Sequence, residues 1–156
     1  MTDKTDVVAI DVVTDVVTDV VADIVAQVAT ALSLDHDWIR GGDSVLFQRC
    51  VGCHHTWYFQ RDFCPNCGVH GPQSLISAGR GIVHASSLVH RAPSDEFRAL
   101  APYRLLLVDL AEGFRMMGHG DSALLIGDAV QGQIRTIAGR ALPYFDRYAE
   151  PASTSR

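Results

Sequence analysis

The residues best suited to chemistry are four cysteines, which are all the cysteines of the 156-residue chain. They form two Cys-x-x-Cys pairs, Cys50–Cys53 and Cys64–Cys67, with ten residues between the pairs. Each short turn directs two sulfurs toward one point, and four thiolates complete the tetrahedral shell that a structural zinc ion prefers. Gly68 follows the second pair, where we expect a backbone φ above zero. The spacing therefore predicts a closed, structural zinc ribbon with one zinc ion per chain.

Other uses of these thiols have weaker support in the sequence. Two disulfides would need an oxidising compartment, and no signal peptide or apolar stretch precedes the cysteines to indicate one. A thioredoxin-like redox motif would need a single pair where a strand leads into a helix. Three imidazoles are alternative ligands, although four available thiolates favour a solvated or packing role for them; they are His54, His55 and His70. A closed four-sulfur site holds structure and leaves no open position for catalysis.

The charge of the chain is distributed unevenly. Residues 1–37 hold eight aspartates and one lysine, whereas residues 38–156 hold ten acids and twelve arginines. Such a nearly neutral main part argues against a nucleic-acid groove, which normally needs clustered lysines and arginines. No apolar run approaches the ~20 residues of a membrane span. We therefore expect a soluble, cytoplasmic protein that does not bind nucleic acid or a membrane.

The elements around the cysteines follow from hydrophobic periodicity. Residues 6–26 repeat an Asp-Val-Val-Thr-like unit, which favours an amphipathic helix over a strand; a weakly ordered, low-complexity extension remains an open alternative. The Pro-rich loop after residue 90 predicts one helical turn within 94–100. Short segments rich in β-branched and aromatic residues predict ribbon strands and then about five antiparallel strands of a small closed barrel. The expected strands are 45–48, 56–59, 82–89, 103–110, 114–118, 123–126, 129–130 and 133–137.

An ordered set of motifs resembles the DUF35 family of zinc-ribbon plus OB-fold proteins. The motifs are Phe47-Gln-Arg-Cys50, both cysteine pairs, Gly79-Arg-Gly81, Val89-His-Arg-Ala-Pro93, Pro102-Tyr103, Leu110-Ala-Glu-Gly113, Ile126-Gly-Asp-Ala-Val130 and Leu142-Pro-Tyr-Phe145. The resemblance implies a mainly β fold with an N-terminal helix, in which a rubredoxin-like zinc ribbon precedes a five-stranded OB-fold barrel. The expected parts are an N-terminal helical or low-complexity extension (1–37), the ribbon (38–77), the OB-fold (78–148) and a disordered tail (149–156).

The same resemblance implies a function through a partner. Members of the family typically assemble with thiolase-like catalytic subunits that act on acyl-CoA, for example in aromatic or sterol degradation, with acyl-CoA at the shared interface. The sequence agrees that this chain has no catalyst of its own, because all its thiols are assigned to zinc. No nucleophile stands in a recognisable pattern with His84, His90 or His119. Asp109 and Glu112 flank a turn and are interpreted as solvated turn residues.

Arginines near the first barrel strand and the Pro-rich loop are candidates for the phosphates of CoA. Arg80, Arg91 and Arg104, with Arg98 between them, lie close in sequence, and the planar guanidinium pairs well with phosphate. Ordinary surface or interface ion pairs are the competing interpretation. For the whole chain, the alternative function is a single-stranded nucleic-acid-binding OB-fold protein, which would use aromatic platforms in a basic groove.

Overall fold

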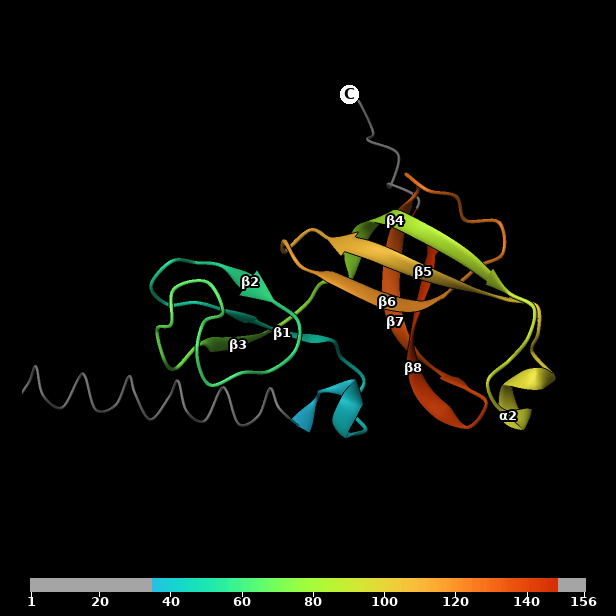
Figure 1. Ribbon diagram of the computed structural model, residues 1–156, viewed down its shortest axis with the longest axis horizontal. Helices are drawn as coiled ribbons and strands as arrows, with labels where there is room; N and C mark the ends of the chain where they lie inside the picture. The colour runs from blue at the N-terminus through green and yellow to red at the C-terminus, as the bar shows by residue number, and fades with distance from the viewer. Residues whose placement is uncertain (1–34, 149–156) are drawn as a thin grey trace, which may run out of the picture. The chain divides into compact units, whose positions relative to one another are not determined.

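The computed structural model describes residues 35–148, so the predicted N-terminal helix and the C-terminal tail lie outside the described residues. Within them the chain forms eight strands, a single helical turn and one 3-10 turn (Figure 1). The fold is mainly β, as predicted, and contains a three-stranded sheet and a closed five-stranded barrel. The bounds are η1 (Trp38–Arg40), β1 (Leu46–Arg49), β2 (Thr56–Trp57), β3 (Gln73–Ile76), β4 (Arg80–Val89), α2 (Asp95–Arg98), β5 (Tyr103–Leu110), β6 (Arg115–Gly120), β7 (Ala129–Ile137) and β8 (Arg140–Arg147).

The three-stranded sheet carries the cysteine turns. Its order is β2-β1-β3, and β1 pairs antiparallel with both neighbours. The first two strands lie where the sequence predicted them, but β3 was not predicted. Its Gln-Ser-Leu-Ile sequence has only two apolar residues, so it gave no clear strand pattern. We keep the name ribbon for residues 38–77, which contain this sheet.

The barrel closes in the order β4-β5-β6-β8-β7. The predicted strand at 103–110 coincides with β5, and the predicted helical turn is α2. The predicted strand at 123–126 is wrong, because this segment is a turn. The expectation of a wholly antiparallel barrel is also wrong, since β6 pairs parallel with β8 at His119↔Tyr144 and Gly120↔Phe145. The strand β8 itself was not predicted.

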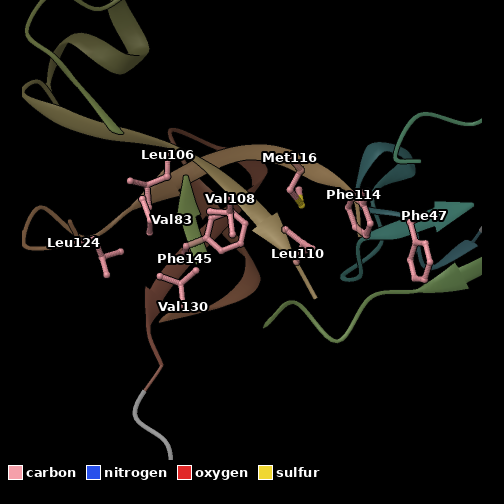
Figure 2. Packing of buried hydrophobic residues seen from close by; sticks show 10 residues of the cluster. All are labelled: Phe47, Val83, Leu106, Val108, Leu110, Phe114, Met116, Leu124, Val130 and Phe145. Atoms are coloured by element: carbon pink, nitrogen blue, oxygen red, sulfur yellow. The ribbon is translucent and has the colours of Figure 1, made fainter. Parts of the chain in front are cut away.

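The barrel interior is organised around the ring of Phe145, which is 1% exposed. Figure 2 shows this ring among the aliphatic side chains of the neighbouring strands. Glycines make the room for it: a Cβ on Gly118 would lie 2.7 Å from Phe145 Cε2, and one on Gly132 would lie 2.8 Å from Cε1. The two glycines therefore leave space at opposite edges of the Phe145 ring, and the ring fills it.

The ribbon is joined to the barrel by packing and by hydrogen bonds. Phe47 of β1 belongs to the same buried cluster as Phe114, and Figure 2 shows the two rings side by side, away from Phe145. Glu112, in the β5–β6 turn, accepts a hydrogen bond from Thr56 Oγ1 at its main-chain oxygen (3.0 Å). Its carboxylate accepts from Ser77 Oγ (2.9 Å) and Ala78 N (2.7 Å). Glu112 is therefore not the solvated turn residue that the sequence predicted.

No helix formed by residues 35–148 has both the length and the apolar character needed to cross a lipid bilayer.

Candidate metal centre

The four cysteine sulfurs gather at one point of the ribbon. All four Sγ atoms lie within 4.8 Å of one another, and the cross-turn pairs Cys50–Cys67 and Cys53–Cys64 are 3.5 and 3.6 Å apart. A tetrahedron with Zn–S bonds of about 2.3 Å has S···S edges of about 3.8 Å. The donor set and its size therefore fit a four-coordinate metal ion such as zinc.

The two cysteine turns repeat the same backbone hydrogen bonds. The amide of Cys50 donates to His55 O (2.9 Å), and the amide of the residue four positions on, His54, donates to Cys50 O (3.1 Å). The second turn repeats both bonds with Cys64 as the first residue. The residue four positions after the first cysteine has a left-handed backbone in each turn, with φ of 59° at His54 and 76° at Gly68. The predicted positive φ of Gly68 is confirmed, and an imidazole-bearing residue adopts the same conformation in the first turn.

Donors also surround the sulfurs. The amides of Gly52 and Cys53 both point at Cys50 Sγ (3.3 Å each), and the amide of Asn66 points at Cys64 Sγ (3.4 Å). The Asn66 side chain donates from Nδ2 to Cys53 Sγ at 3.6 Å. These bonds stabilise negative charge on sulfur, which is the form that binds a metal. This role of the Asn66 side chain was not predicted. Its position between Cys64 and Cys67 could have indicated a donor to the sulfurs.

The pKa values of the thiols reflect these donors. The amide of His55, and after it the Asn66 side chain, lower the pKa of Cys53 to about 6. The amide of Val69 acts in the same direction on Cys67, but the neighbouring thiols outweigh it and raise the pKa of Cys67 to about 12. Deprotonation of Cys53 is thus favoured, whereas deprotonation of Cys67 is disfavoured by the neighbouring sulfurs. A divalent cation bound among the sulfurs would relieve that repulsion.

The three nearby histidines do not join this cluster. His55 stacks on Trp57 with ring centroids 6.0 Å apart, and His70 packs on Phe63 at 5.9 Å. The side chain of His54 is exposed. The packing and solvated roles predicted for these imidazoles therefore agree with the structure. The residue missed beside the site is Gln48, whose buried Oε1 accepts from Trp57 Nε1 (2.8 Å) and Arg61 N (2.6 Å).

The arginines that lie close in sequence are separated by the length of β4. Arg80 begins this strand and lies over the ring of Tyr148, 5.1 Å from its centroid. Arg104 of β5 lies opposite Leu88 in the strand register, near the other end of β4. The exposed Arg91 lies three residues after Leu88. Ten strand residues span about 30 Å. The structure thus places Arg91 and Arg104 at one end of β4 and Arg80 at the other.

Arg104 lines a surface cleft of about 330 Å³ together with aromatic side chains. Its Nη1 donates to Ser86 Oγ, and its buried Nε has no hydrogen-bond partner among residues 35–148. Tyr103 and His119 line the same cleft, with their rings 5.2 Å apart. Burial lowers the pKa of His119, so the neutral imidazole is favoured there. The cleft combines the cation of Arg104 with flat ring surfaces, and Asp121 also lines it.

One histidine–carboxylate pair lies on the outer face of the barrel. His84 Nδ1 is 3.1 Å from Asp109 Oδ2, and Arg115 donates to the same carboxylate (Nη2 to Oδ2, 3.1 Å). Asp109 lies within β5 and is paired with Arg115 and His84, so it is not the turn residue predicted, although its side chain is 47% exposed. Arg115 and then His84 lower the pKa of Asp109. Within residues 35–148 no serine, threonine or cysteine side chain is hydrogen bonded to His84. The pair therefore lacks a nucleophile to activate.

Comparisons with known proteins converge on one group. The family model described as "ChsH2, C-terminal OB-fold domain" matches residues 77–135. A DUF35 domain-containing scaffold protein of Methanothermobacter thermautotrophicus is 31% identical over 94 residues, which cover 57% of this chain and 70% of that protein. A scaffold protein of the same description from Methanocaldococcus jannaschii is 35% identical over 72 residues, 46% of this chain and half of that relative's length.

A solved structure described as "Ltp2-ChsH2(DUF35) aldolase" shares the fold. The match has a TM-score of 0.58 and 27% sequence identity, and it covers 67% of this chain and 84% of the other. The matched family model and this structure both carry the name ChsH2.

Proposed function

The chain belongs to the DUF35 family, and from this membership we propose that it is a non-catalytic, zinc-binding OB-fold subunit of a larger enzyme. In this proposal it assembles with a thiolase-like catalytic subunit and supports acyl-CoA binding, or the cleavage or formation of a carbon–carbon bond, by that partner. The observation that carries the proposal is the likeness to the ChsH2 chain whose structure is described as an aldolase with Ltp2. The relatives named scaffold proteins support the same division of labour.

The chemistry of the chain's own residues supports a non-catalytic role. The four thiols occupy one compact site, so none is free to act as a nucleophile elsewhere. In the described part of the barrel, His84 pairs with the carboxylate of Asp109, and His119 packs against the rings of Phe97 and Tyr103. Bond-making groups would then come from the partner.

Zinc has a structural role in the proposal. Cys50, Cys53, Cys64 and Cys67 would be its ligands, and the closed four-sulfur shell would tie together two turns of a sheet that has little core of its own. Structural zinc contributes on the order of 10–16 kcal/mol in small zinc domains. The metal would thus hold the shape of the ribbon.

The acyl-CoA part of the proposal rests on the cleft beside Arg104. Its guanidinium and the nearby Arg91 would meet phosphate oxygens, while the rings of Tyr103 and His119 offer apolar surface. Arg80 lies at the far end of β4 and would contact a different part of the ligand or none.

Purification of the tagged chain from its source tests the proposal directly. We expect a thiolase-like chain to co-purify, and acyl-CoA turnover by the complex but not by this chain alone. A chain that purifies without partners and turns over acyl-CoA by itself would refute the non-catalytic role. Tight, salt-sensitive binding to single-stranded oligonucleotides in a mobility-shift assay would favour the nucleic-acid alternative.

Substitution of the arginines tests the acyl-CoA part. Arg91→Ala with Arg104→Ala should weaken acyl-CoA binding by the assembled complex by roughly 1.5–3 kcal/mol per charged hydrogen bond lost. Arg140→Ala, which removes only an exposed ion pair with Glu96, is the matched control. Normal acyl-CoA affinity in the double variant would exclude a phosphate role. Failure of assembly would instead assign these arginines to the interface.

A further inference from the structure

A stack of four aromatic rings runs from the buried junction of ribbon and barrel to the surface. Phe47 stacks on Phe114 with centroids 5.1 Å apart, Tyr58 stacks on Phe114 at 5.8 Å with nearly parallel planes, and Phe59 packs on Tyr58 at 4.7 Å. Figure 2 shows the inner pair, Phe47 and Phe114. Phe114 is 5% exposed, whereas Phe59 is 68% exposed. The outermost ring is thus an exposed aromatic side chain supported from inside the protein.

The third ring is fixed by a hydrogen bond as well as by stacking. Trp38 Nε1 donates to Tyr58 OH at 2.7 Å. Burial raises the pKa of Tyr58 to about 12, so the hydroxyl stays neutral. Because Tyr58 is held from two sides, Phe59 packs on a surface that is already ordered. A ligand that contacts Phe59 would lose little conformational entropy in ordering this surface.

A cleft of about 370 Å³ lies beside the stack, and the charged residues that line it are all cationic. Three of the rings line it, Tyr58, Phe59 and Phe114, and so do the cations Arg61 and Arg115, but no aspartate or glutamate does. Arg115 is paired with Asp109. Arg61 makes no ion pair within residues 35–148. The cleft therefore presents apolar rings and one uncompensated guanidinium.

We propose that this cleft binds a segment of a partner polypeptide in which an aromatic or large aliphatic side chain is flanked by carboxylates. The apolar side chain would pack on Phe59, and a carboxylate would pair with Arg61. The partner is the catalytic subunit, so this identification rests on the proposed function. A nucleic acid also combines flat rings with negative charge, but it needs a row of cations along its backbone. The cleft offers one unpaired cation, Arg61, and residues 38–156 hold only two more arginines than acids.

Peptide probes test the chemistry of the cleft without the partner. Amide NMR spectra of the full, zinc-loaded chain are recorded with Ac-Glu-Phe-Glu-Leu-Glu-NH2, with the analogue in which lysines replace the glutamates, and with hexathymidylate. We expect the acidic peptide to shift the amides of Phe59, Arg61 and Phe114 and to bind about tenfold more tightly than the basic one. Arg61→Glu should reverse that preference.

Equal binding of the two peptides, or no shift at these amides with either, overturns the proposal. Binding of hexathymidylate at these amides without binding of the acidic peptide overturns it too, in favour of nucleic acid.

The assembled complex supplies the second test. Phe59→Ser and Arg61→Glu should each weaken association with the co-purified catalytic subunit by about tenfold or more. Leu125→Ser is the matched control, because Leu125 is as exposed (65%) but lies on a barrel turn away from the cleft. Wild-type affinity in both cleft variants would overturn the cleft as the docking site and leave the proposed function intact. Absence of any catalytic subunit would refute the proposed function, and the peptide result would still decide the chemistry of the cleft.

Discussion

Gly118→Ala should destabilise the barrel by overpacking the Phe145 ring. The added Cβ would lie 2.7 Å from Phe145 Cε2 and 2.9 Å from Pro143 O, although carbon atoms normally approach no closer than about 3.5 Å. The ring cannot move far, because its opposite edge already lies against Gly132. Overpacking of this kind costs about 1–3 kcal/mol, and the lower chain entropy of unfolded alanine offsets roughly 0.4–1 kcal/mol. We therefore expect a net loss of about 1–2 kcal/mol.

Urea unfolding measures this loss, and a double-mutant cycle with Phe145→Leu identifies its cause. Zinc is held in constant excess so that metal binding does not differ between samples. Phe145→Leu alone should be destabilising because it leaves space in the core. In that background Gly118→Ala should cost less, because only the close contact of the added Cβ with Pro143 O remains, which gives a coupling of about 1 kcal/mol or more. An equal cost of Gly118→Ala in both backgrounds would refute the steric explanation.

Three further outcomes follow from the site and the barrel. Elemental analysis should find one zinc per wild-type chain and loss of it in Cys64→Ser, with the barrel still folded; full retention of metal would contradict a four-thiolate site. His54→Gly should raise the free energy of unfolding by roughly 0.5–1 kcal/mol, and Gly68→Ala should lower it by about 1 kcal/mol, because both positions are left-handed; chemical denaturation that shows the opposite signs would be inconsistent with equivalent turns. Burial lowers the pKa of His119 from 6.5, so the unfolded chain binds more protons as the pH falls below about 6.5; stability should then decline until the pH passes the folded pKa, and His119→Gln should remove this part of the pH profile.

The candidate metal centre could be predicted from the sequence because its determinants are local. Two Cys-x-x-Cys turns fix the donor atoms and their approximate directions, and Gly68 marks a backbone requirement that the spacing alone implies. The bonds from Glu112 to the ribbon could not be predicted. Thr56 and Glu112, for example, are 56 positions apart in the sequence, and no local pattern encodes their contact.

The strands show the same distinction. Residues 103–110 alternate in burial along a mostly apolar run and were predicted with correct bounds. Residues 123–126 are also apolar, but Asp121 accepts from Ala123 N (2.7 Å) and Asp128 accepts from Leu125 N (2.8 Å), so the amides are used within a turn. Side chains thus replaced the ladder bonds that a strand would need. In β8, Pro143 interrupts the strand pattern, and the segment becomes a strand through eight pairings with β7.

We expect the barrel to open most readily at the parallel contact between β6 and β8. Only two residue pairs hold that seam, compared with six between β5 and β6 and eight between β7 and β8. The seam between β4 and β7 has three pairs, and backbone hydrogen bonds of Val83 and Gly79 with the chain around β7 extend it. Pro143 borders the seam and has no N–H with which to extend it. Amide hydrogens near this seam should therefore exchange with solvent through local opening, while those between β7 and β8 exchange only through larger unfolding. The barrel is closed in this structure, and we expect it to open first along the β6–β8 seam.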